Sequence, residues 1–187
     1  MHSRFLYASA TICILASLGC GDQGSKEAGS SSTDGEDAVP YVQYLQGTFQ
    51  TTSPDGGVTY EEVDVLAEKI IDSAAGTIVE YTLHGDEVRT TFFTLQPGTR
   101  IFDVTDEENT FSGTMTFETD DWATSDVTYD LEIFGQYPGT MTGSGVWEAD
   151  TYITDKLFAN PAGTVEARTT EVLTIIGEDE YSAALPE

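Results

Sequence analysis

The chain contains very little cysteine. Its two cysteines among 187 residues, Cys13 and Cys20, both lie in the first twenty positions. The segment after Cys20 therefore cannot form a disulfide within itself, and a domain of that length does not need one. Histidine is as rare, since only His84 follows His2. Zinc and haem sites usually need more such ligands, so we predict no cofactor. We expect His84, beside Gly85, to be a solvated turn side chain.

Positive charge is scarce as well. The chain has 7 Lys and Arg against 33 Asp and Glu, a formal net charge of −26. We therefore expect no nucleic-acid partner, because binding of phosphates needs a basic surface. The acidic residues are spread along the chain, which is typical of a solvated surface. Adaptation to high salt or to divalent cations is the alternative interpretation.

Recognisable catalytic motifs are missing. There is no Gly-x-Ser-x-Gly elbow, phosphate loop or dinucleotide fingerprint. Carboxylates are so numerous that no glycosidase-type pair stands out. We therefore predict a protein that is not an enzyme, and keep a carboxylate-dependent hydrolase as the least favoured alternative.

The one apolar run at the start of the chain, residues 5–18, follows Arg4. It is too short to cross a bilayer, which takes about 20 apolar residues, and it suits a secretory signal. The run ends in Ser17-Leu18-Gly19-Cys20, which resembles the lipobox of bacterial lipoproteins. That resemblance implies cleavage after residue 19 and a lipid anchor on Cys20, with acyl chains such as palmitate. The alternative is an ordinary secretory signal that leaves Cys20 as a free thiol.

The same resemblance carries an expectation about location. Two or more acyl chains hold a protein stably on a membrane without a spanning helix. In the enterobacterial sorting pattern, Asp directly after the lipidated cysteine signals retention at the inner membrane, and here that position is Gly21. We therefore expect a cell-envelope lipoprotein that is anchored in the outer membrane. The sequence leaves open whether it is on the periplasmic or the surface face of that membrane.

Aromatic residues are absent from residues 20–40, which are rich in Gly, Ser and acid. Such a segment cannot bury enough apolar surface to fold, so we predict a flexible linker there, after the lipidated Cys20 that the resemblance implies. Residues 41–187 have the length of one domain.

Alternation of apolar and polar residues is the strongest signal in that domain. On 110–118, Phe111, Met115 and Phe117 share one face, and on 127–134 Val127 and Tyr129 do the same. This pattern predicts strands of an antiparallel sheet. Further strands are expected at 44–51, 77–84, 88–95, 100–105, 140–149, 164–176 and 181–185. A sheet of about 8–10 strands with short connections avoids open edges by closing, so we predict a mainly β, up-and-down antiparallel barrel.

One segment departs from this pattern. Apolar residues at helical spacing, including Val63, Leu66 and Ile70, predict one helix near residues 60–75. Thr59 and Glu62 are placed to form its capping box. A strand with a bulge is the competing interpretation.

The stretch "LQGTFQ" is similar to the opening strand of lipocalin-like barrels, with Gly47 and Phe49 at the positions of their Gly-x-Trp motif. The ending "TEVLTIIGEDEYSAAL" resembles their closing hairpin, with 177–180 as its turn. This resemblance implies a barrel around an apolar cavity, and a bound ligand by analogy.

The candidate ligand-binding residues are aromatic side chains that can line such a cavity, namely Phe92, Phe111, Phe117, Tyr129 and Trp147. We expect a small apolar or amphipathic ligand. A barrel filled by its own side chains, which would serve as a surface scaffold for protein partners, is the alternative.

Acidic residues crowd two predicted loops. The first holds Asp103, Asp106, Glu107 and Glu108, a candidate calcium site because calcium prefers several oxygen ligands from one loop. The second holds Glu118, Asp120, Asp121 and Asp126. Polar hairpin turns without a cation are the alternative for both.

Overall fold

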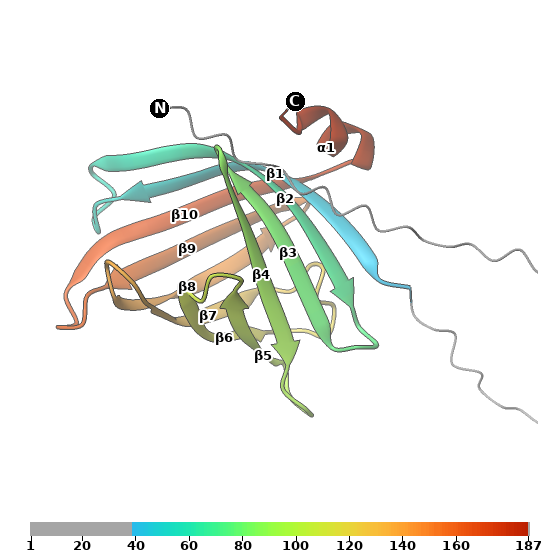
Figure 1. Cartoon of the computed structure of the whole chain (residues 1–187), viewed down its shortest axis with the longest axis horizontal. Coiled ribbons are helices and arrows are strands. Elements are labelled where there is room, and N and C mark those ends of the chain that lie inside the picture. Colours follow the sequence, from blue (N-terminus) through green and yellow to red (C-terminus); the bar gives the residue numbers. More distant parts are fainter. Residues whose placement is uncertain (1–38, 187) are drawn as a thin grey trace, which may run out of the picture. The chain divides into compact units, whose positions relative to one another are not determined.

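The computed structural model describes residues 39–186. The predicted signal, Cys20 and almost the whole predicted linker lie outside the described residues. Ten strands form a closed antiparallel barrel in which each strand pairs with the next, and β10 returns to pair with β1 (Figure 1). The predicted up-and-down barrel is confirmed. The strands are β1 (Tyr41–Thr52), β2 (Thr59–Asp72), β3 (Thr77–His84), β4 (Glu87–Leu95), β5 (Ile101–Asp106), β6 (Phe111–Phe117), β7 (Val127–Ile133), β8 (Gly139–Glu148), β9 (Thr151–Ala159) and β10 (Val165–Ile176).

The predicted alternation orients the strands. On β6 and β7, Met115, Phe117, Val127 and Leu131 are buried inside the barrel, while the intervening threonines and acids face outward. These four residues join one apolar core cluster with Ile71, Ile78, Phe93, Phe102 and Val104. A second, smaller cluster consists of Leu45, Val65, Ala67 and Leu173. The barrel therefore has an apolar interior along much of its wall.

The helix predicted near residues 60–75 is wrong. These residues form most of β2, a strand of 14 residues that pairs with β1 and β3 along its length. Val65, Ala67 and Ile71 point inward at a spacing of two, but Leu66 and Ile70 on the outer face are apolar as well, and together they imitate a helical period. The competing strand interpretation holds, because cross-strand pairing suits the β-branched residues of this segment. The bulge of that interpretation is present as well, because between Thr51 and Thr52 of β1 the register skips Tyr60, which is the extra residue on β2.

The predicted closing hairpin around 177–180 is also wrong. Gly177 caps the helix α1 (Glu178–Ala184), whose first turn holds Glu178, Asp179 and Glu180, where acidic side chains interact favourably with the helix dipole. Tyr181 of α1 packs against Tyr44 of β1, with 4.7 Å between ring centroids. The last hairpin of the barrel is instead formed by β9 and β10, and β9 was missing from the predicted strands. Figure 1 shows α1 beside one end of β1.

No helix among residues 39–186 is both long and apolar enough to cross a membrane.

Candidate ligand-binding cavity

A cavity of about 270 Å³ lies inside the barrel. Part of its wall is apolar and is formed by side chains such as Phe93, Met115, Leu131 and Leu173. The rest is polar and holds ionisable groups from six strands: Lys69, Glu80, His84, Arg89, Tyr129, Tyr152, Lys156 and Glu171. The cavity thus offers both apolar contact and charge.

The loop between β6 and β7, residues 118–126, closes one end of the barrel. Trp122 packs edge-on against Phe102 at 4.8 Å between ring centroids, and Gln43 Nε2 donates a hydrogen bond to Ala123 O at 3.3 Å. Arg89 of β4 lies near the opposite end of the barrel. Its side chain lines the cavity, and about half of it is exposed. The cavity therefore meets solvent beside Arg89.

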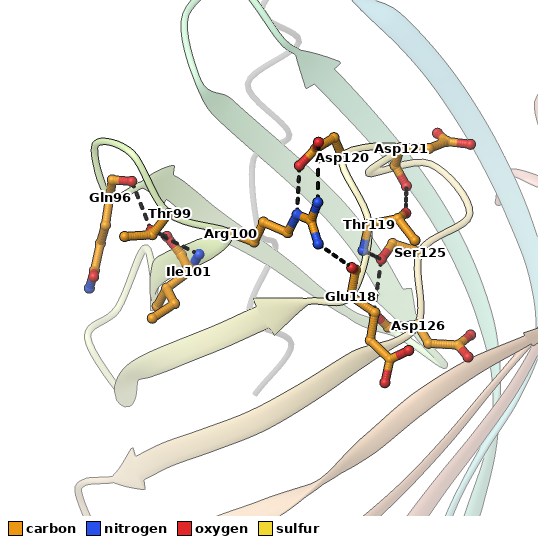
Figure 2. A network of polar contacts seen from close by, with 10 residues as sticks. All are labelled: Gln96, Thr99, Arg100, Ile101, Glu118, Thr119, Asp120, Asp121, Ser125 and Asp126. Carbon is orange, nitrogen blue, oxygen red and sulfur yellow. Dashed lines mark hydrogen bonds and ion pairs between the residues drawn. The ribbon is translucent and has the colours of Figure 1, made fainter.

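Figure 2 shows how this loop is attached to the strands. Arg100, directly before β5, donates from Nε to Asp120 Oδ1 at 2.7 Å and from Nη1 to Glu118 O at 2.7 Å. Ser125 accepts a hydrogen bond from Thr119 N at 2.9 Å and donates one to Asp126 O at 2.9 Å. Arg100 and Ser125 thus hold the two ends of the loop together.

Two glycines of β8 allow close approach of β9, one of its side chain Tyr152 and the other of its backbone. A Cβ atom on Gly145 would lie 2.1 Å from the hydroxyl of Tyr152, and one on Gly143 would lie 2.1 Å from the backbone oxygen of Asp155. The ring of Tyr152 therefore lies across β8, where it also packs against Trp147 at 5.0 Å. The glycine-rich run "GTMTGSG" has this spatial role, which its strand position alone did not indicate.

The best-connected group in the cavity is Glu171 of β10. Its Oε2 accepts hydrogen bonds from Lys156 Nζ at 2.9 Å and from Thr154 Oγ1 at 3.1 Å, and its Oε1 lies 3.9 Å from His84 Nε2. Burial alone would raise the pKa of Glu171, but Lys156 and His84 outweigh it and lower this pKa. Glu171 is therefore ionised and paired.

His84 does not behave as the solvated turn residue that we expected. Its side chain is 16% exposed, lines the cavity, and packs against the Phe49 ring at 5.1 Å. Burial lowers the pKa of His84, and nearby Glu171 only partly offsets this effect. The last inward-facing residue of a strand can point into the barrel even when a turn follows it directly.

Two tyrosines, from β7 and β9, meet inside the barrel over the strand β8 that lies between them. The hydroxyls of Tyr129 and Tyr152 are hydrogen-bonded to each other, and Lys156 Nζ lies 5.0 Å from the centroid of the Tyr129 ring, a cation–π distance. Burial raises the pKa of both tyrosines, so both stay protonated. One bond between two hydroxyls uses one O–H, so the other is left to donate elsewhere.

Lys69 and Glu80 face each other across β2 and β3 and both line the cavity. Among the residues from 39 to 186, no acid lies within 4.0 Å of Lys69 and no base lies within 4.0 Å of Glu80. Burial lowers the pKa of Lys69, and Glu80 partly opposes that shift. Burial raises the pKa of Glu80, against the effect of Lys69. These two groups lack the direct pairing that Glu171 has.

The structure distributes the five aromatic candidates over three locations. Phe111, Tyr129 and Trp147 line the cavity. Phe117 is buried in the apolar core beside Phe102. Phe92 is 39% exposed on the outer face of β4, because the register turns its neighbour Phe93 inward instead.

The structure does not gather the candidate calcium ligands Asp103, Asp106, Glu107 and Glu108 around one point. Within the described part of the chain, no group of three or more His, Cys, Asp or Glu side chains is placed to hold a metal ion. Asp106 instead closes the β5–β6 turn, where its Oδ1 accepts hydrogen bonds from Thr110 N at 2.6 Å and Phe111 N at 3.3 Å. Asp103 accepts one from Gln96 Nε2 at 2.8 Å on the outer surface. Three acids of the second loop, Asp120, Asp121 and Asp126, likewise accept hydrogen bonds from the protein through their carboxylates.

The ionisable residues of the cavity were missed by sequence reasoning. Lys69 was hidden in the segment taken for a helix, and Lys156 lies in β9, which was not predicted. Glu80 and Glu171 were two acids among 33. The available signal was the position of a charged residue on the inward side of an alternating strand.

Comparisons of the chain with protein-family models, with curated proteins and with solved structures found no match. The functional argument therefore depends on the geometry of the cavity.

Proposed function

We propose that this barrel binds a small amphipathic molecule in its cavity, as lipocalin-like barrels do. The observation that carries the proposal is a cavity of about 270 Å³ whose wall is apolar on one part and ionisable on another. This volume is slightly below the ~300–1,000 Å³ of typical small-molecule sites, which favours a small ligand. The ligand's apolar part would lie on Phe93, Met115 and Leu131, and its polar part near Lys69 and Glu80.

The unpaired charges favour this function over a filled scaffold barrel. A buried charge without a partner costs free energy, and a barrel that only presents its outer surface has no use for one. Polar groups that violate the rules of core packing are typical of functional sites. A ligand that pairs with Lys69 or Glu80 would remove part of this cost.

Binding can be tested with two variants of one strand. Thr91 lines the cavity, whereas Thr94 is exposed on the same strand. Thr91→Phe should fill the cavity and reduce binding of a hydrophobic fluorescent dye at least tenfold, and Thr94→Phe should leave it unchanged. Mass spectrometry of the natively purified protein should identify a co-purifying ligand. If no ligand co-purifies and the dye does not bind the unmodified protein, the proposal fails.

We further propose that the protein is an exported lipoprotein of the cell envelope, held at the outer membrane by acyl chains on Cys20. The lipobox-like ending Ser17-Leu18-Gly19-Cys20 supports this anchoring. The variant Cys20→Ser should leave the membrane fraction and lack the added lipid mass. If it still sediments with membranes, the anchoring proposal is wrong.

One observation favours a second candidate function, hydrolysis by two carboxylates. Glu80 and Glu171 both line the cavity, and their environments shift their pKa values in opposite directions, which is the arrangement of an acid and a base or nucleophile. A panel of aryl glycosides tests this function. Turnover that Glu80→Gln abolishes would establish it, and absence of turnover on the whole panel would exclude it for such substrates.

A further inference from the structure

The cavity collects the rare cations of this acidic chain. Residues 39–186 contain five Lys and Arg, and three of them, Lys69, Arg89 and Lys156, line the cavity. Arg100 and Arg168 form ion pairs outside it, with Asp120 and Asp155. Only two carboxylates, Glu80 and Glu171, line the same cavity. Most of the cations in the described part of the chain therefore face the cavity, although the protein as a whole is strongly negative.

The three cations differ in how far they are already neutralised. Lys156 is paired with Glu171 at 2.9 Å, and Arg89 with Glu87 at 3.1 Å. Lys69 is 8% exposed and has neither a hydrogen bond nor an acid within 4.0 Å in the described part of the chain. Its ammonium is the cation left to bind a ligand.

Other donors in the cavity also lack an acceptor. Thr169 Oγ1 is buried without a hydrogen-bond partner among residues 39–186, and its residue, 6% exposed, lines the cavity. One hydroxyl of the pair formed by Tyr129 and Tyr152 keeps its O–H free. These two hydroxyls and Lys69 all donate, whereas an ionised carboxylate only accepts.

We infer that the ligand of this cavity is a carboxylate amphiphile, whose anionic head group pairs with Lys69 and whose tail lies on the apolar wall. The inference rests on the proposed function, because it names the chemistry of the molecule that the cavity binds. Glu80, opposite Lys69, is the group that would oppose such a head group. Burial raises the pKa of Glu80, which weakens this opposition, because a carboxyl group that keeps its proton does not repel an anion.

Three probes of eight carbons each, with different head groups, separate the inference from the proposed function. Octanoate, 1-octanol and octylamine are titrated into the purified protein at neutral pH by calorimetry. A charged hydrogen bond in a buried site contributes enough for octanoate to bind about 10-fold to 100-fold more tightly than octanol. Equal affinities, or a preference for octylamine, would overturn the inference and leave the proposed function standing. Binding of none of the three would overturn both.

A matched pair of variants tests the role of Lys69. Lys69→Met keeps the length of the side chain and removes its charge, and it should weaken octanoate at least tenfold with octanol unchanged. Arg168→Gln removes the same charge on the outer surface and should change neither affinity. The variant Lys69→Arg should restore much of the preference for the acid. If Lys69→Met binds octanoate as tightly as the unmodified protein, the inference is overturned.

Discussion

Lys156 and Glu171 form an ion pair inside the barrel along a diagonal of the sheet. Their Nζ and Oε2 atoms are 2.9 Å apart, yet the register places Lys156 opposite Thr169 and Glu171 opposite Thr154. Thr154 donates its hydroxyl to the same Oε2. The carboxylate is therefore held from two sides, and its charge has both a cation and a hydroxyl to compensate its burial.

We predict that Glu171→Gln lowers the free energy of unfolding by about 3–5 kcal/mol at neutral pH, because Lys156 stays behind as a buried cation without its partner. The lowered pKa of Glu171 means that its contribution is present above the ordinary value of 4.5 and is lost as pH falls through the lowered pKa. Urea denaturation at neutral and acid pH measures both effects. Glu166→Gln, on the exposed start of β10, should leave the unfolding midpoint unchanged. An equal loss at neutral and strongly acid pH would contradict the assignment.

Glu80→Gln should change the free energy of unfolding in the opposite direction to Glu171→Gln. Burial raises the pKa of Glu80, so its contribution to stability is present below the ordinary value of 4.5 and is lost as pH rises through the raised pKa. At neutral pH the substitution should therefore stabilise the ligand-free protein, because it removes the cost of ionising a buried carboxyl group. Thermal unfolding across this pH range measures the difference. Destabilisation at neutral pH would show that Glu80 has a stabilising partner, with Lys69 the first to examine.

Gly47→Ala should destabilise the barrel by about 1–3 kcal/mol, through overpacking. A Cβ at this position would lie 1.8 Å from the backbone oxygen of Val172 on the paired strand β10, and a backbone atom cannot rotate away. Gly177→Ala is the control, because no atom lies within 4 Å of its added Cβ and the φ angle of Gly177 is −76°. Chemical denaturation compares the two. Equal stability of both variants would mean that β1 and β10 can separate at no cost.

Arg100→Gln should loosen the loop of residues 118–126 without unfolding the barrel. Arg100 and Asp120 are exposed, so their ion pair adds little to global stability, but its bonds to Asp120 and Glu118 O hold the loop to β5. We expect faster hydrogen exchange at the amides of Thr119 and Ala123 and an unchanged unfolding midpoint. Arg168→Gln removes the other exposed Arg–Asp pair and should not affect these amides. Exchange that stays as slow as in the unmodified protein would assign the loop's order to Trp122 instead.

The local alternation of apolar and polar residues was sufficient to predict much of the sheet. The alternation around Phe111–Phe117 and Val127–Ile133 identified two strands and the sides that they bury, because a strand with one wet face repeats every two residues. The same reasoning failed for β2, where apolar residues lie on both faces. Only its pairing with β1 and β3 decided between a helix and a strand.

The candidate site divides in the same way. Phe111, Tyr129 and Trp147 were accessible to pattern reasoning because aromatic side chains on the apolar side of a strand line the interior. Phe92 was assigned to the cavity in error, because two adjacent phenylalanines of β4 point to opposite faces and composition does not choose between them.

The amino-acid sequence alone determined the β class of the domain, its antiparallel up-and-down order and the strong negative charge, because strand period, short turns and composition are local properties. Closure of the barrel decided the rest. It brought Lys69 and Glu80 to the same cavity as Lys156 and Glu171, which lie far from them along the chain. A charged residue gains a functional role here only when the ten strands enclose it. Burial of its charge costs free energy, and a bound partner lowers that cost.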